Sequence, residues 1–215
     1  MDIRKYKGVI FDLDGTLLDS MDVWNRVDIE FFENRNMQMP TDYQDNVKTM
    51  HFPTAAKYTK ERFNLSDSIE EIMAEWTTLC LDAYKNEIKL KNGAFEFLHF
   101  LDENNIKISY ATANSEILCE KCLKSNGVWD LFCARAYSEE VNKSKSEPDI
   151  YLLASERMNL KPQDCNVFED LYEGIIGAKK GGFSTCGVSD KTNLISRNQI
   201  RKEADFYIDS FTELL

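Results

Sequence analysis

Two aspartates one residue apart, Asp12 and Asp14, are the side chains of this sequence best suited to chemistry. They come directly after Val9-Ile10-Phe11, an apolar run typical of a strand that is buried on both faces. Because alternate residues of a strand face the same side, we expect both carboxylates to point the same way. Such a pair could hold a hard cation and divide the roles of nucleophile and proton carrier. The alternative interpretation is an ordinary Asp-Gly turn that ends a strand.

The segment after this pair has helical patterns and no convincing strand. Helices are predicted from a cap at Asp19 or Ser20 to about Asn36, and at residues 43–48, 53–63 and 67–87. A stretch this long is not a loop in a compact domain. We therefore predict a helical cap domain over residues 16–90, inserted into a core made by residues 1–15 and 91–215.

From Gly93 onward, helical and strand patterns alternate. The strands are predicted at residues 106–111, 132–137, 166–168, 184–188 and 204–208, and the helices between them at 94–104, 115–125, 149–158 and 172–180. This alternation predicts an α/β fold with a Rossmann-like three-layer core, in which helices cover both faces of a parallel sheet. Sites in such sheets lie beyond the carboxyl ends of the strands.

Other reactive residues follow other predicted strands. Thr112-Ala113-Asn114 comes after the strand at 106–111, where the next helix also offers backbone N–H groups to an anion. Glu169-Asp170 follows the strand at 166–168, and Lys143 and Lys145 precede a helix that begins with a proline. Each of these alone fits a helix cap, a turn or a solvated charge. Their joint placement at strand ends favours one shared site over the turn-only interpretation of Asp12 and Asp14.

The chain resembles the haloacid dehalogenase-like superfamily, in the branch with a helical cap, over essentially its whole length. The residues that carry the resemblance to the family's four motifs are Asp12-Leu13-Asp14-Gly15-Thr16, Thr112 with Asn114, Lys145 with Pro148-Asp149-Ile150-Tyr151, and Val167-Phe168-Glu169-Asp170. The spacing to Pro148-Asp149 favours Lys145 as the lysine of the third motif, with Lys143 as the alternative.

The resemblance implies a role for each of these residues. Asp12 is expected to be the nucleophile and Asp14 the general acid and base. Mg²⁺ is the expected cofactor, held by the Asp12 carboxylate, the backbone carbonyl of Asp14, Asp170, and Glu169 either directly or through water. The phosphoryl oxygens are expected to be bound by Lys145, Thr112, Ala113 and Asn114.

The implied function is that of a magnesium-dependent phosphatase acting through an aspartyl-phosphate. Its partner would be a small phosphorylated metabolite, such as a sugar phosphate, phosphoglycolate or a nucleotide monophosphate. In the cap, Lys48 or His51 is a candidate substrate contact, the alternative being an ordinary solvated turn. Two other functions stay open: a phosphosugar mutase of the β-phosphoglucomutase type, and a catalytically silent magnesium-binding interaction protein.

Composition limits the partners of the protein. At 215 residues with 43% hydrophobic side chains, the chain is large enough for a packed core. The net charge of −11 and the lack of a basic cluster argue against nucleic acid and acidic membrane surfaces as partners. The sequence has no apolar run long enough to span a bilayer and no signal-peptide core, so a cytoplasmic protein is predicted. A monomer is the default expectation.

Overall fold

The computed structural model describes residues 2–47, 50–193 and 196–215 of the chain. Within these ranges, six parallel strands form one sheet in the order β3-β2-β1-β4-β5-β6. The strands are β1 (Gly8–Phe11), β2 (Lys107–Thr112), β3 (Phe132–Tyr137), β4 (Cys165–Glu169), β5 (Ser184–Val188) and β6 (Phe206–Ile208). The parallel α/β class predicted from the sequence is confirmed.

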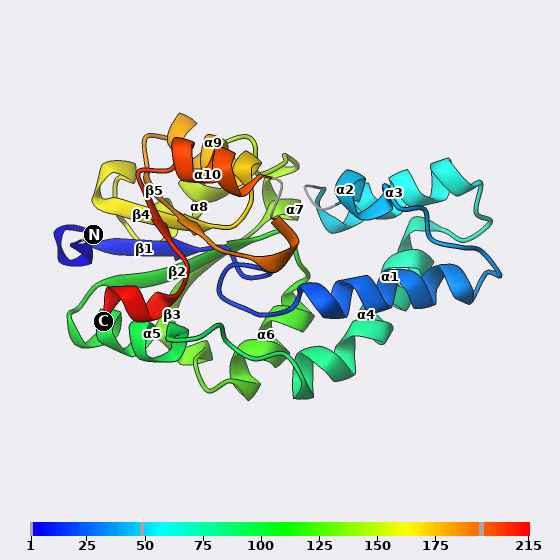
Figure 1. Ribbon diagram of the computed structural model, residues 1–215, viewed down its shortest axis with the longest axis horizontal. Helices are drawn as coiled ribbons and strands as arrows, with labels where there is room; N and C mark the ends of the chain where they lie inside the picture. The colour runs from blue at the N-terminus through cyan, green and yellow to red at the C-terminus, as the bar shows by residue number, and fades with distance from the viewer. Residues whose placement is uncertain (1, 48–49, 194–195) are drawn as a thin grey trace.

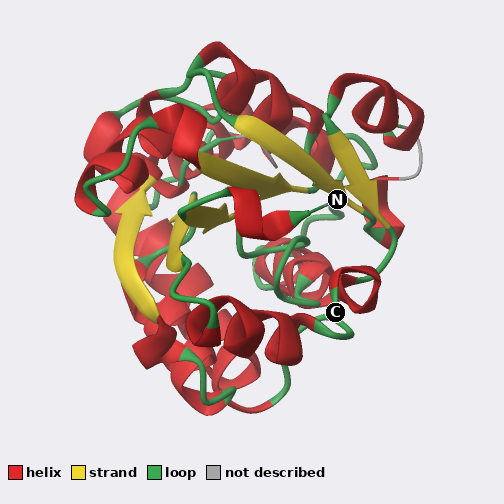
Figure 2. Ribbon diagram, turned by 90° about the vertical axis from the view of Figure 1, so that its left-hand side faces the viewer, coloured by secondary structure: helices red, strands yellow, loops and turns green. Residues whose placement is uncertain are grey.

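Helices cover both faces of the sheet, which gives the three-layer core (Figures 1 and 2). The flanking helices are α5 (Ala94–Glu103), α6 (Glu116–Ser125), α7 (Ser138–Val141), α8 (Asp149–Arg157), α9 (Tyr172–Lys180) and α10 (Arg197–Glu203). Short 3₁₀ turns complete the chain, namely η1 (Ile3–Lys5), η2 (Trp129–Leu131), η3 (Pro162–Asp164), η4 (Lys191–Asn193) and η5 (Phe211–Leu214).

The central strand β1 is buried along its whole length because both of its faces pack against helices. Val9 and Phe11 belong to the apolar cluster that includes Phe97 of α5. Ile10, which faces the other way, belongs to the cluster that includes Ile150 of α8. The continuous apolar run before Asp12 is therefore explained by burial on both faces.

The segment between β1 and α5 carries a group of helices that lies beyond the end of the sheet toward which β1 runs (Figure 1). These inserted helices are α1 (Met21–Glu33), α2 (Tyr43–Val47), α3 (Phe52–Phe63) and α4 (Ile69–Asn86). Their limits agree with the predicted helices to within a few residues. In the described part of the chain, no helix has the length and apolar character that crossing a membrane would require.

The two connections between the sheet and the inserted helices run side by side. The Asp19 N–H donates to the carbonyl of Lys89 at 3.0 Å, and the Lys91 N–H donates to the carbonyl of Leu17 at 2.9 Å. Leu18 and Leu90 form an antiparallel bridge between these hydrogen bonds. The inserted helices are thus attached through one narrow, paired neck.

The helices α4 and α1 begin in different ways. Ser68 caps α4, because its Oγ accepts from the Glu71 N–H at 3.1 Å and the Glu71 carboxylate accepts from the Ser68 N–H at 2.7 Å. Ser20 occupies the cap position of α1, but its side chain makes no capping hydrogen bond. Its hydroxyl instead donates to Asp14. Ser20, which was expected to cap a helix, therefore contacts one of the two aspartates instead.

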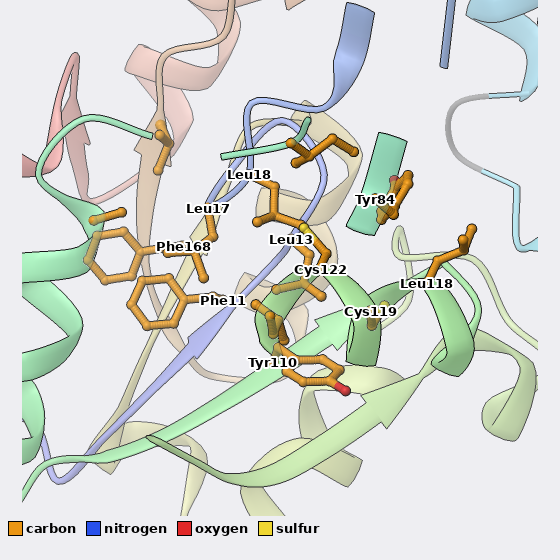
Figure 3. Close-up of a cluster of buried hydrophobic side chains, with 14 of the residues drawn as sticks. Phe11, Leu13, Leu17, Leu18, Tyr84, Tyr110, Leu118, Cys119, Cys122 and Phe168 are labelled. Carbon is orange, nitrogen blue, oxygen red and sulfur yellow. The ribbon is translucent and has the colours of Figure 1, made fainter. Parts of the chain in front are cut away.

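An apolar cluster supports the loop that carries the two aspartates (Figure 3). The rings of Phe11 and Phe168 stack with their centroids 5.1 Å apart. Leu13, between the two aspartates, is fully buried in the same cluster, which reaches Tyr84 of α4. The loop after β1 is thus anchored by its apolar side chain while its acidic neighbours face elsewhere.

Candidate active site

Three neighbouring strands end in the polar residues singled out from the sequence. Asp12 follows β1, Thr112 is the last residue of β2, and Glu169 is the last residue of β4 and precedes Asp170. These residues are all buried. Because β1 lies between β2 and β4 in a parallel sheet, they meet at one edge, as expected.

Lys145 reaches this edge from the segment before α8. Its Nζ donates to Oδ1 of Asp12 and, at 2.6 Å, to Oε1 of Glu169. The lysine side chain is only 6% exposed. Burial lowers the pKa of Lys145, but the two carboxylates raise it by more than burial lowers it. The net shift of the pKa is therefore upward, and the amine stays charged. Lys143 lies elsewhere, in an exposed ion pair with Asp149 at 2.8 Å.

Glu169 is fixed by several donors besides Lys145. The Tyr151 hydroxyl donates to its Oε1 at 2.8 Å, and the Leu171 N–H donates to its Oε2 at 3.3 Å. A Cβ on Gly174, in the first turn of α9, would lie 2.4 Å from the Glu169 carboxyl carbon. The glycine thus leaves room for this buried carboxylate.

Three buried carboxylates, those of Asp12, Glu169 and Asp170, place oxygens within 4.8 Å of one another. Burial, with repulsion from Glu169, raises the pKa of Asp12 to about 6 even though Lys145 opposes the shift. Burial and the neighbouring carboxylates raise the pKa of Asp170 well above its ordinary value. An all-oxygen donor set with excess negative charge fits a hard divalent cation such as Mg²⁺.

The loop after β1 approaches this cluster closely. Gly15 has φ +82°, and a Cβ at this position would lie 2.6 Å from Oδ2 of Asp170. The next residue, Thr16, donates from its hydroxyl to Oδ1 of Asp170 at 3.0 Å. The turn therefore requires glycine both for its left-handed conformation and for the space that Asp170 fills.

Asp14 lies in different surroundings from Asp12, because its neighbours are neutral donors. Ser20 Oγ donates to its Oδ1 at 2.6 Å and Trp24 Nε1 at 3.4 Å, and Tyr84 donates to the same oxygen. Asn114 Nδ2 donates to Oδ2 at 2.8 Å. Burial raises the pKa of Asp14, and the hydrogen bonds from Ser20 and Tyr84 partly oppose this. The site thus holds two carboxylates in unlike environments.

The segment after β2 is tied to Asp14. Asn114 Nδ2 also contacts the Tyr84 hydroxyl at 2.8 Å, and its Oδ1 accepts from the Ser115 N–H at 2.7 Å. The side chain predicted to bind phosphate is thus engaged with Asp14 and Tyr84. Thr112 Oγ1 accepts from the Asn114 N–H at 3.1 Å.

A cavity of about 400 Å³ connects this edge of the sheet with the inserted helices. Asp12, Asp14, Lys145 and Asp170 line it, as do Thr112, Ala113 and Asn114. His51 is not among its lining residues, and its Nε2 instead contacts Thr54 Oγ1 at 2.7 Å. The other candidate from the inserted segment, Lys48, lies outside the described residues.

Several side chains around the two aspartates were not assigned to the site from the sequence: Thr16, Ser20, Trp24, Tyr84 and Tyr151. Tyr151 stands in the third motif, which was a usable signal. Ser20 is at a predicted helix cap, and Trp24 and Tyr84 lie within predicted helices. Nothing in the local pattern distinguishes these residues from ordinary helix residues.

Fold and site together define a protein of the α/β class with a cluster of buried carboxylates at the carboxyl end of its parallel sheet. The family model for "Haloacid dehalogenase-like hydrolase" matches residues 9–188. The chain belongs to this family and is a phosphoric monoester hydrolase, as the resemblance implied.

Curated relatives in this family carry the names of phosphatases. Validoxylamine A 7'-phosphate phosphatase of Streptomyces hygroscopicus subsp. limoneus is 26% identical over 216 residues, covering 97% of this chain and 96% of the relative. Hexitol phosphatase A of Escherichia coli is 28% identical over 198 residues, covering 90% and 88%. Among solved structures, CbbY from Rhodobacter sphaeroides in complex with phosphate superposes with a TM-score of 0.85 at 22% identity, covering 97% and 96% of the two chains. This last likeness concerns the fold.

Proposed function

We propose that the protein is a magnesium-dependent phosphatase that hydrolyses a small phosphorylated metabolite through a phosphorylated Asp12. The observation that carries the proposal is the contrast between two neighbouring buried carboxylates. Asp12 contacts a lysine cation and belongs to an acidic cluster, whereas the donors to Asp14 among the described residues are all neutral. Unlike environments allow one carboxylate to attack while the other carries a proton.

Asp12 is the nucleophile in this proposal. Its carboxylate oxygen forms a bond to phosphorus while the bond from phosphorus to the leaving oxygen breaks. Lys145 keeps the attacking carboxylate oriented through its contact with Oδ1 and offsets charge on the phosphoryl oxygens. Thr112, Ala113 and Asn114 also line the cavity and would complete the phosphate site.

Asp14 moves the proton. It donates a proton to the leaving oxygen in the first half-reaction. In the second, it takes a proton from the water that attacks phosphorus, while the bond between phosphorus and the Asp12 oxygen breaks and frees the carboxylate. The burial that raises its pKa favours the protonated form that the first step needs. Holding Asp14 through Ser20, Tyr84 and Asn114 keeps its carboxyl group at a defined position between turnovers.

Mg²⁺ would be held by Asp12, Asp170, the Asp14 backbone carbonyl and Glu169, directly or through water. When bound, it supplies positive charge that neutralises the carboxylate cluster and the phosphoryl oxygens. Glu169 is already occupied by Lys145 and Tyr151, which favours the water-mediated arrangement for this residue.

We also propose that residues 16–90 act as a cap that moves on its neck relative to a core of residues 1–15 and 91–215. The cavity lies between the two parts, so opening at the paired connections would admit substrate and closing would exclude water. We propose a monomer as the active unit, since the proposed nucleophile, proton carrier and metal ligands all belong to one chain.

Phosphate release from a panel of phosphomonoesters, with Mg²⁺ or with EDTA, tests this proposal. We expect hydrolysis of several small esters with Mg²⁺ and at least a 100-fold loss with EDTA. Equal rates with EDTA would contradict the metal dependence. Conversion of a hexose 1-phosphate to its 6-phosphate with little free phosphate would contradict hydrolysis and support the mutase alternative.

A further inference from the structure

On the side of the inserted helices, the cavity is lined by a buried acid that the proposed chemistry does not use. Asp28 lies on α1, is only 8% exposed and lines the cavity. Gln44 Nε2 of α2 donates to its Oδ2 at 3.1 Å. Among the described residues, no other group donates to this carboxylate. A carboxylate can accept about four hydrogen bonds, so most of this capacity is left open toward the cavity.

The burial of Asp28 has a cost that its protein contacts do not offset. Buried polar groups are normally satisfied by hydrogen bonds, and buried charges are normally paired. Within the described ranges, Asp28 has one neutral donor and no cation partner, and burial raises its pKa to about 6. A group that lowers stability in this way and faces a ligand cavity is a candidate for ligand recognition.

Aromatic side chains form the wall of the cavity beside Asp28. Trp24 contacts Phe52 edge to face with centroids 6.0 Å apart, and Phe52 contacts Trp76 at 5.4 Å. The indole N–H of Trp76 is buried and donates to no group of the described chain. The inserted-helix side of the cavity thus combines apolar faces with an open acceptor and, among the described residues, a buried, unpaired donor. Apolar walls with a few polar groups are typical of small-molecule sites.

Charge around the cavity limits what the leaving group can carry. Lys145 is the one Lys, Arg or His among the described lining residues, and it already pairs with Asp12 and Glu169. Asp28 of α1 adds negative charge to the lining, whereas the charge of Asp22 is paired with Lys191. A second anionic group on the substrate would therefore meet repulsion near Asp28.

We propose that Asp28 is a specificity-determining residue that accepts a hydrogen bond from a hydroxyl of the leaving group. The preferred substrates are then hydroxyl-bearing phosphomonoesters without a second anionic group. The aromatic wall packs on the apolar C–H faces of such a group. This inference rests on the proposed phosphatase function.

The test compares the wild type with Asp28→Asn on matched esters in the presence of Mg²⁺. Hexose, hexitol and pentose monophosphates supply hydroxyls, phenyl phosphate has none, and 2-phosphoglycolate carries a second anion. For the best hydroxylated ester, we expect Asp28→Asn to lower kcat/KM by about 10- to 100-fold. Phenyl phosphate should change less than about twofold. Asp82→Asn, which removes the same charge from the exposed side of α4, should change neither rate.

The outcomes separate this inference from the proposed function. A wild type that hydrolyses phenyl phosphate, with an Asp28→Asn variant that slows all esters equally or none, overturns the specificity role alone. The role is also overturned if the wild type prefers 2-phosphoglycolate to every hydroxylated ester. A wild type that releases phosphate from no ester overturns both proposals. The melting temperature of Asp28→Asn, measured by circular dichroism, separates a loss of folding from a loss of substrate recognition. Asp28→Ser, which has a smaller uncharged side chain, is a second variant for the same comparison of esters.

Discussion

The hydroxyl of Tyr84 donates a hydrogen bond to Oδ1 of Asp14, a residue 70 positions earlier in the chain. This contact joins the end of α4 directly to the loop after β1. The same hydroxyl lies 2.8 Å from Nδ2 of Asn114, which contacts the other oxygen of Asp14. Residues from the inserted helices and from the sheet therefore hold the proposed proton carrier together.

Removing this hydroxyl with Tyr84→Phe is expected to lower kcat about tenfold, because Asp14 loses one positioning hydrogen bond worth roughly 1 kcal/mol. KM for a small ester should change little, since Tyr84 is not expected to bind substrate. Steady-state kinetics measures both parameters. Tyr58→Phe on α3, which loses a hydroxyl bonded to Arg62, is the matched control and should leave kcat within twofold. An unchanged kcat for Tyr84→Phe would show that the contact is only structural.

The two lysines before α8 give a second prediction. Lys145→Ala leaves Asp12 and Glu169 without their shared cation, and we expect kcat/KM to fall by roughly 100- to 1000-fold. Lys143→Ala breaks only an exposed pair and should have no measurable effect. Phosphate release and the melting temperature of both variants should be measured together. The reverse ranking would move the third motif to Lys143.

Mg²⁺ should stabilise the protein, because the acidic cluster that would hold the ion exists only in the folded chain. Mg²⁺ at about 100 times its Kd contributes roughly 2.7 kcal/mol, which for a chain of this length raises Tm by about 5–10 °C. Asp170→Asn should abolish most of this shift, because Asp170 belongs to the cluster. Asp149→Asn, on the surface, should retain it. Differential scanning calorimetry with and without Mg²⁺ measures the shift, and an equal shift in all three proteins would place the ion elsewhere.

Asp28 should make the stability of the protein depend on pH. Burial raises its pKa from 3.8 to about 6. Between about pH 4 and 6, the folded protein keeps a proton on this group that the unfolded chain has released. Stability therefore falls as pH rises through this window, and the loss is complete above it.

Asp28→Asn removes this loss. At pH 7.5 we expect its free energy of unfolding to exceed that of the wild type by up to about 3 kcal/mol, with the difference vanishing near pH 4. Urea unfolding at the two pH values measures the difference, and Asp82→Asn is the control. A variant that is less stable than the wild type at pH 7.5 would show that Asp28 is satisfied within the protein.

Much of the fold follows from local sequence patterns. The strands at 132–137 and 184–188 have the predicted limits, and each is a short run that is followed by a serine. The positions of Asp12, Thr112 and Glu169 at strand ends also follow, since parallel strands bring their carboxyl ends to one edge. The last strand is shorter than predicted, because Asp205 accepts from the Thr185 N–H instead of joining β6.

The surroundings of Asp14 and the inserted-helix side of the cavity could not be predicted in the same way. Ser20, Tyr84 and Asp28 occupy ordinary helix positions, and only the packing of the inserted helices brings them to the site or the cavity. That packing depends on contacts between α1 and α4 across a long sequence separation, which periodicity does not specify. The contact between Asn114 and Tyr84 could not be predicted for the same reason, because it depends on where α4 packs.

The most direct test of the account is to trap the phosphoryl group on Asp12 during turnover. The protein is mixed with an excess of a good ester and Mg²⁺, reduced with borohydride within milliseconds, digested and analysed by peptide mass spectrometry. We predict reduction of an acyl phosphate at position 12 and nowhere else, with no such product in Asp12→Asn, whose phosphate release should fall by at least 1000-fold. Full turnover by Asp12→Asn, or a trapped phosphoryl group on any other residue, would contradict the central claim.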